Sequence, residues 1–196
     1  MRTQAIIIKK QSTNEYDQFV TCYTQELGKL TAIAKSVLKP HSVQAMQLNL
    51  MNLVEFELVS GRGIPIITGT HTVRAHYVIK DNLSNLGIAY FFLEAIDRII
   101  FDYERDDQLW NLLTELFTDL NMPLELGAIM PLLRRKQKEL LTILGYAPEA
   151  SLTVNRFNGH AQEDSVFEQL AQSHFASLSF LYRVLSSANL PAGRQV

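Results

Sequence analysis

Few residues of this 196-residue chain have types and spacings that suit nucleophilic catalysis. Ser36 and Lys39 match the S-x-x-K spacing, in which a lysine amine activates a serine hydroxyl. The partner motifs of that chemistry are missing and the pair falls in an expected loop, so coincidence is the favoured interpretation. Cys22 stands in the middle of an apolar run and is expected to be a small core residue. GxxxxGK[ST], HExxH and GxGxxG motifs are also missing. We therefore predict no catalytic residues.

Two groups of residues carry side chains that metals prefer. His71 and His76 are an odd number of residues apart in an extended stretch, which would point them to opposite faces. Four acidic residues, Asp102, Glu104, Asp106 and Asp107, lie close together but lack the spacing and the glycine of a calcium loop. Asp106 or Asp107 is better explained as the N-cap of a following helix. We predict no metal site and no cofactor.

Basic residues are concentrated in the first part of the chain. Residues 1–80 hold nine Lys and Arg against five Asp and Glu, a formal charge of +4, whereas residues 81–196 carry −6. Cations beside aromatic rings on a barrel can track a phosphate backbone and stack bases. The alternative is ordinary solvated charge, with the aromatic residues in the core. The cations concerned are Lys29, Lys35, Lys39, Arg62 and Arg74, and the aromatic residues are Tyr16, Phe19, Tyr23 and Phe56.

The first 75 residues have the pattern of short strands. Isoleucine-rich residues 3–10 suit a sheet, because β-branched side chains fit there better than in a helix. Residues 54–58 alternate strictly between apolar and acidic side chains, which is typical of a strand with one face in water. Three further strands are expected at residues 16–24, 30–35 and 64–73. Five short antiparallel strands favour a small closed barrel, since closure removes exposed sheet edges.

After residue 80 the apolar period becomes helical. Helices are expected over residues 83–100, 109–120 and 131–144, the last with Pro131 near its first turn and Gly145 after its end. One or two further helices are expected between residues 166 and 185. The predicted fold class is therefore α+β, with a barrel domain over residues 1–80 and a helical domain over residues 81–196.

Apolar runs in this chain are short. None reaches the roughly 18–20 residues that span a bilayer, and residues 5–8 are too few for the apolar core of a signal peptide. Cys22 is the single cysteine, so no internal disulfide can form. We expect a cytoplasmic protein that does not contact a membrane.

Three segments, taken together, resemble the RecO family of bacterial recombination mediators. Residues 16–35 read YDQFVTCYTQELGKLTAIAK, similar to the family pattern LVTLFTxELGKLxAVAKG. Residues 54–63 read VEFELVSGRG, similar to LELELYRGRG, and residues 140–148 read LLTILGYAP, similar to LLELLGYAP. The three segments occur in the order and at the spacing of the family.

The resemblance implies a non-enzymatic DNA-repair protein with an N-terminal OB-type barrel and a helical domain. Members bind single- and double-stranded DNA, anneal complementary strands, and act with RecR and the acidic tail of single-strand binding protein to load RecA at gaps. It implies a nucleoid-associated protein with phosphate contacts at Lys29, Lys35 and Arg62 and, less directly, at Lys39 and Arg74. The alternative is a protein–protein adaptor of the same fold with little DNA affinity, because the helical half is acidic and rich in Phe and Leu.

One departure from the family concerns zinc. Many members carry the four cysteines of a zinc module soon after the GYAP motif, whereas residues 150–164 of this chain hold none. Residues 149–175 offer only His160 and His174, fourteen residues apart, and a structural zinc needs about four Cys or His ligands. We predict no structural zinc.

A second group of cations lies in the otherwise acidic helical half. It comprises Arg134, Arg135, Lys136 and Lys138, and we expect Leu133, Leu140 and Leu144 to form an exposed apolar seam beside it. An acidic peptide that ends in a hydrophobic residue needs a cationic rim and an apolar slot. Arg134, Arg135 and Lys138 are therefore the predicted docking site for the acidic tail of single-strand binding protein. The alternative is a solvated charged face balanced by Glu139.

Overall fold

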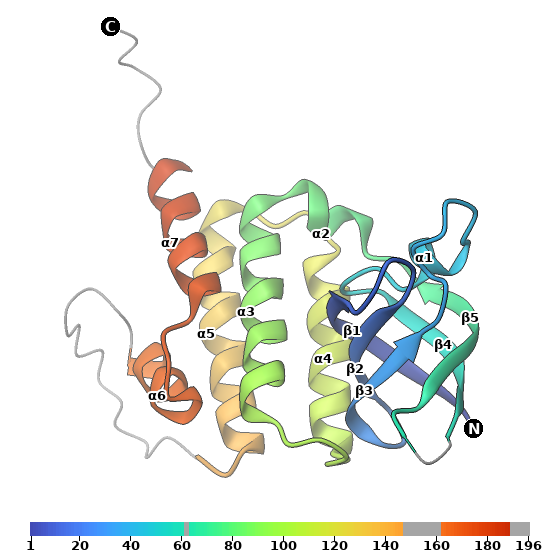
Figure 1. The fold of residues 1–196 in the computed structure, drawn as a ribbon. Coiled ribbons are helices and arrows are strands. Elements are labelled where there is room, and N and C mark those ends of the chain that lie inside the picture. The colour runs from blue at the N-terminus through green and yellow to red at the C-terminus, as the bar shows by residue number, and fades with distance from the viewer. Residues whose placement is uncertain (61–62, 147–161, 189–196) are drawn as a thin grey trace, which may run out of the picture. The chain divides into compact units, whose positions relative to one another are not determined.

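The computed structural model describes residues 1–60, 63–146 and 162–188 (Figure 1). The chain forms two compact units, one of Met1–His76 with Ala95–Asp119 and the other of Tyr77–Glu94 with Leu120–Val196. The units interleave along the chain, because helix α3 (Leu83–Ile99) contributes residues to both. The domain boundary at residue 80 stays a prediction.

The first unit contains a closed five-stranded barrel, which confirms the predicted OB-type barrel of an α+β protein. Neighbouring strands follow the order β1-β2-β3-β5-β4 around the barrel (Figure 1). Four of the five neighbouring pairs are antiparallel, but β3 and β5 are parallel, so the expectation of antiparallel pairing is wrong at that junction. Parallel neighbours need a crossover, which residues 35–65 provide. The strands are β1 (Arg2–Ser12), β2 (Gln18–Thr24), β3 (Gly28–Ala34), β4 (Leu53–Val59) and β5 (Ile66–Arg74).

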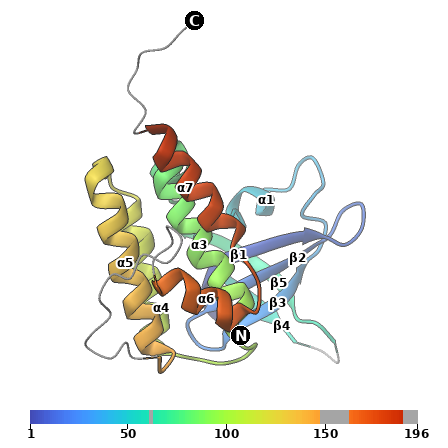
Figure 2. The same cartoon turned by 90° about the vertical axis from the view of Figure 1, so that its left-hand side faces the viewer.

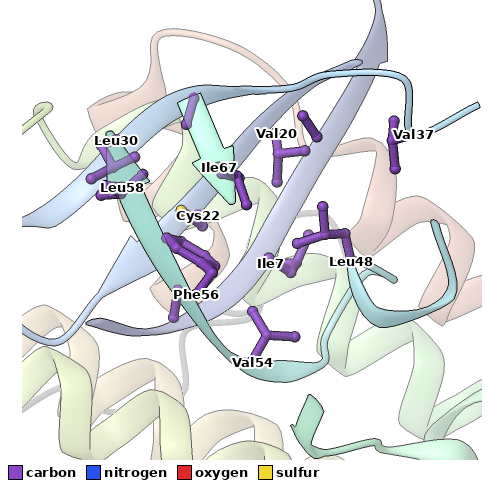
Figure 3. Close-up of a cluster of buried hydrophobic side chains, with 13 residues drawn as sticks. Ile7, Val20, Cys22, Leu30, Val37, Leu48, Val54, Phe56, Leu58 and Ile67 are labelled. Atoms are coloured by element: carbon purple, nitrogen blue, oxygen red, sulfur yellow. The ribbon is translucent and has the colours of Figure 1, made fainter. Parts of the chain in front are cut away.

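Alternating side chains of these strands fill the barrel interior (Figure 3). In β4, Val54, Phe56 and Leu58 are buried while Glu57 is exposed, as the alternating pattern predicts. Cys22 of β2 is also buried in this core. Burial raises the pKa of its thiol, since the charged form loses hydration. A neutral, enclosed thiol is the expected small core residue.

Helices α3 and α4 (Asp107–Leu120) match the predicted helices within two residues at each end. Asp106 is the N-cap of α4, because its Oδ1 accepts the backbone N–H groups of Gln108 at 2.7 Å and Leu109 at 3.0 Å. Two short helices, α1 (Gln44–Gln47) and α2 (Tyr77–Asp81), were not predicted. One turn of helix is too short to establish an apolar period.

Helix α5 (Leu126–Ile143) begins five residues earlier than predicted. Pro131 therefore lies inside the helix and not at its start. Proline lacks the N–H that would bond the carbonyl group of Gly127. Both residues are exposed, so water can hydrate that carbonyl. The C-terminal signal was correct, because Gly145 has a φ of +80° just after the helix.

Phenylalanine rings form the centre of the second unit. The Phe91 ring centroid lies 5.1 Å from that of Phe167 on α6 (Gln162–Ala171) and 5.3 Å from that of Phe175. The Glu94 carboxylate accepts the N–H of Ser177 at 3.0 Å at the start of α7 (Ala176–Ala188). Helices α6 and α7 lie beside α5 (Figure 2). The one or two predicted C-terminal helices are thus two.

Candidate nucleic-acid interface

The β2–β3 hairpin has a covered end, formed by Tyr23, Gly28 and Lys29 where the hairpin turns. Lys29 is 8% exposed; its Nζ donates to the Asp97 carbonyl oxygen at 2.9 Å and lies 3.4 Å from Asp102 Oδ1. Its own carbonyl oxygen accepts the Tyr103 N–H at 2.7 Å. Lys29 is therefore buried and its charge is satisfied by partners in the same unit, which makes it less suited to bind a phosphate than an exposed lysine. The phosphate contact at Lys29 itself stays a prediction.

Tyr23 and Gly28 contact the segment of residues 104–106, close to the partners of Lys29. The Tyr23 hydroxyl accepts the Asp106 N–H at 3.1 Å, and burial raises the pKa of Tyr23 to about 12. Gly28 has a φ of +69°, and a Cβ atom there would lie 2.0 Å from the Glu104 carbonyl oxygen. Position 28 thus requires glycine for its backbone conformation and for this close approach. The covered end joins the barrel to residues 97–106.

The opposite, open end of the hairpin is formed by Tyr16, Phe19, Ile33, Lys35 and Lys39. Lys35 and Lys39 are exposed, and Lys39 Nζ lies 5.5 Å from the centroid of the Tyr16 ring, which is itself 41% exposed. Phe19 and Ile33 are paired across β2 and β3, and both are partly exposed. Cationic, aromatic and apolar groups therefore adjoin at this end. That combination can contact phosphates and stack bases.

Hydrogen bonds join the two loops that carry these residues. Asp17 Oδ1, in the loop before β2, accepts the N–H of Ser36, in the loop after β3, at 2.6 Å. Asp17 Oδ2 accepts Asn14 Nδ2 at 3.0 Å, and Asn14 Oδ1 accepts the Asp17 N–H at 2.8 Å. The hydrogen bond from Ser36, then that from Asn14, lowers the pKa of Asp17, with smaller contributions from the charges of Lys35 and Lys39.

A backbone hydrogen bond strengthens the same connection. The N–H of Leu38 donates to the Tyr16 carbonyl oxygen at 2.9 Å. These two hydrogen bonds, Ser36 to Asp17 and Leu38 to Tyr16, therefore keep the loop of Tyr16 next to the loop of Lys39. Sequence reasoning missed Asn14 and Asp17, although Asn and Asp in a polar turn commonly bond nearby backbone N–H groups.

The two other predicted phosphate contacts are Arg62 and Arg74. Arg62 lies outside the described residues. Arg74 is exposed at the C-terminal end of β5, whereas β3 pairs with the N-terminal end of that strand. Its Nη1 donates to Thr118 Oγ1 at 2.7 Å, and it shares a surface hollow with Glu115 and Asp119. These carboxylates would repel a phosphate, so Arg74 is less suited to this contact than Lys35 or Lys39.

Arg134 on α5 is part of a buried polar network. Its Nη1 and Nη2 atoms bond the Asp164 carboxylate at 2.6 and 3.1 Å, and Nη2 donates to the Tyr182 hydroxyl at 2.6 Å. Asp164, 1% exposed, also accepts Gln137 Nε2 at 2.8 Å. Burial by itself would raise the pKa of Asp164, but the hydrogen bonds from Arg134, Tyr182 and Gln137, together with the charge of Arg134, outweigh it and leave that pKa lowered. The network joins α5, α6 and α7.

The premises of the predicted tail-docking site on α5 are therefore wrong in two respects. Arg134 is engaged by Asp164, and Leu133 and Leu140 are buried and do not form an exposed seam. The other two predicted residues, Arg135 and Lys138, differ from Arg134 in having exposed side chains. Lys138 Nζ lies 3.9 Å from Glu163 Oε1.

Parts of this chain are similar in sequence to a known protein family. Residues 1–76, which include the whole barrel, match the family described as "Recombination protein O N terminal". Relatives called "DNA repair protein RecO" include that of Roseiflexus sp., 30% identical over 149 residues, which are 76% of this chain and 51% of the relative. Over about three quarters of its length the chain is therefore similar to RecO proteins. Others are from Heliobacterium modesticaldum, 30% identical over 154 residues (79% and 55%), and Acetivibrio thermocellus, 26% identical over 156 residues (77% and 59%).

The chain spans about half the length of the curated RecO relatives it matches. The matched RecO N-terminal segment contains the covered end and the open end of the hairpin, together with Arg74. Arg134, Arg135 and Lys138 lie outside that segment.

The zinc module that the RecO resemblance implied has no fitting ligand set in the described part of the chain. No group of three His, Cys, Asp or Glu residues there could hold a metal ion. His174 lies 2.5 Å from Glu168 Oε1 and 2.7 Å from Ser179 Oγ through its two ring nitrogens, and His160 lies outside the described residues. The lack of a structural zinc stays a prediction. No described helix is long and apolar enough to cross a membrane.

Proposed function

We propose that the open end of the β2–β3 hairpin binds single-stranded DNA and that the chain acts in DNA repair and recombination as a non-enzymatic mediator. The observation that supports the site is the exposed Tyr16 ring beside the Lys39 ammonium, with Lys35 nearby on the same pair of loops. The names of the RecO relatives support the cellular role.

In the proposed complex, Lys35 and Lys39 neutralise neighbouring phosphates and release their counterions. The Tyr16 ring stacks on an unpaired base, and the partly exposed Phe19 and Ile33 contact the next sugar or base. Contacts to phosphates and base faces leave the Watson–Crick edges of the strand accessible. A strand held in this way can still pair, which suits annealing. Double-stranded DNA would meet the lysines but could not stack on Tyr16, because its bases are already stacked.

The remaining functions implied by the resemblance belong to the same proposal. They are cooperation with RecR, contact with the acidic tail of single-strand binding protein, help in RecA loading, and a nucleoid-associated location in the cytoplasm. For the acidic tail, only Arg135 and Lys138 of the predicted site have exposed side chains. These two cations are the ones we propose for that contact.

The test is a titration of a labelled oligothymidylate at several salt concentrations. The double variant Lys35→Glu/Lys39→Glu should weaken binding by about 30-fold, since two exposed charge contacts contribute about 2 kcal/mol together. The slope of log K against log salt should become shallower by about 1.4, which corresponds to two single-strand phosphate contacts. The control is Lys80→Glu/Arg183→Glu, which changes the net charge equally at two other exposed positions.

Equal weakening in both double variants would mean that net charge, and not the open end, attracts DNA. No binding by the unaltered chain at low salt would instead favour the adaptor function. Binding that survives Lys35→Glu/Lys39→Glu would move the site away from the open end.

A further inference from the structure

The open end contains an acidic residue where a DNA-binding surface should avoid one. Asp17 belongs to the loop that carries Tyr16 and bonds the loop that carries Lys35 and Lys39. Its pKa is lowered, so it is charged at neutral pH. An anion this close to the proposed phosphate path repels the ligand. On electrostatic grounds alone, removal of Asp17 should therefore strengthen DNA binding.

The hydrogen bonds of Asp17 point to a different role. Ser36 has a φ of +56°, a left-handed conformation that is unfavourable for a residue with a side chain. Its N–H donates to Asp17 Oδ1 at 2.6 Å, and the next residue, Val37, is fully buried in the barrel core. Ser36 is thus held on one side by Asp17 and on the other by Val37. Its backbone conformation sets the direction in which Lys35 and residues 38–41 leave the barrel.

The second carboxylate oxygen orders the loop before β2. It accepts Asn14 Nδ2 at 3.0 Å, while Asn14 Oδ1 accepts the N–H groups of Tyr16 at 2.9 Å and Asp17 at 2.8 Å. One carboxylate therefore fixes the loop with the aromatic ring and the loop with both lysines. Holding the contact residues in place before binding lowers the ordering cost of binding.

We propose that Asp17 is the positioning residue of this interface, which ties the loop of Tyr16 to the loop of Lys35 and Lys39 so that all three side chains meet one DNA strand. The inference rests on the proposed function of the open end. Asp17 itself does not touch DNA. It acts through Ser36 and Asn14.

A pair of substitutions separates this role from simple repulsion. Asp17→Ala and Asp17→Asn remove the same charge, but asparagine keeps an oxygen that can accept the Ser36 N–H. Asp17→Ala should weaken binding of the labelled oligothymidylate about five- to tenfold, which is the loss of roughly 1 kcal/mol of pre-organisation. Asp17→Asn should bind more tightly than Asp17→Ala, because it keeps the acceptor for Ser36 and loses only the one for Asn14 Nδ2. Equal or tighter binding by both variants would overturn the proposal.

Two further measurements keep this result interpretable. Asn14→Ala leaves the net charge unchanged and removes the other half of the connection, so it should also weaken binding several-fold. Amide exchange at Ser36 and Leu38 should accelerate in Asp17→Ala and not in Asp17→Asn, and unchanged exchange in Asp17→Ala would contradict the proposal. If the Lys35→Glu/Lys39→Glu variant also keeps its DNA binding, the proposed function of the open end has failed. If that variant loses DNA binding while Asp17→Ala and Asp17→Asn bind equally well, only the positioning role of Asp17 has failed.

Discussion

The two ends of the β2–β3 hairpin carry lysines with opposite environments. At the covered end, Lys29 bonds the Asp97 carbonyl oxygen and pairs with Asp102 inside its unit. At the open end, six residues further along the chain, Lys35 is exposed. The difference arises because residues 97–106 pack on one end only. Of two lysines in the same hairpin, Lys29 thus stabilises the fold, whereas Lys35 is a candidate contact for DNA.

The same contrast recurs on α5, and there it predicts the largest effect. Arg134→Ala should destabilise the fold by about 3–5 kcal/mol, because it leaves the buried Asp164 carboxylate without its cation. Arg135→Ala changes an exposed neighbour and should stay within about 0.5 kcal/mol. Urea unfolding of both variants measures the difference. Similar stability of the two variants would mean that Arg134 is a surface cation like its neighbour.

The next largest effect is expected at the turn of the covered end. Gly28→Ala should cost about 2–5 kcal/mol, since left-handed backbone costs about 1–2 and overpacking against the Glu104 carbonyl about 1–3 more. The control is Gly127→Ala, where no atom lies within 4 Å of the added Cβ. Thermal unfolding that places both variants at the same midpoint would disprove the tight contact.

Lysine-to-methionine substitutions at the two ends should have opposite effects: one should lower stability and the other DNA affinity. Lys29→Met keeps the side-chain stem but loses its polar contacts, so it should cost about 1–2 kcal/mol of stability and leave DNA affinity unchanged. Lys35→Met should leave stability within about 0.5 kcal/mol and weaken DNA binding several-fold. Denaturant unfolding and fluorescence anisotropy on both variants measure the exchange. Loss of DNA affinity in Lys29→Met without loss of stability would contradict the comparison.

The smallest effect concerns the aromatic ring of the open end. Tyr16→Ala should weaken single-strand binding about fivefold, at the low end of the energy of base–aromatic stacking, and should leave double-strand binding nearly unchanged. Tyr16→Phe keeps the ring and should bind normally. Parallel titrations with a single strand and its duplex test this, and equal losses for both ligands would argue against stacking.

Sequence patterns predicted the barrel well, because period-two alternation such as that of Val54, Phe56 and Leu58 reports which side chains face the core. The parallel β3–β5 junction was not predictable in this way, since alternation reports burial and not strand direction. Charge patterns predict that the DNA-contacting cations lie in the first part of the chain, and this stays a prediction. They could not distinguish Lys29 from Lys35, or Arg134 from Arg135, because burial of a charge depends on partners distant in sequence such as Asp97 and Asp164.

The most direct test of the central claim is to follow the backbone amide resonances of the intact chain while single-stranded DNA is added. We expect the largest shifts at residues 13–17 and 35–41, with little change at Lys29, Tyr103 or residues 134–138. Shifts that appear at the covered end or on α5 while the open end stays silent would contradict the account.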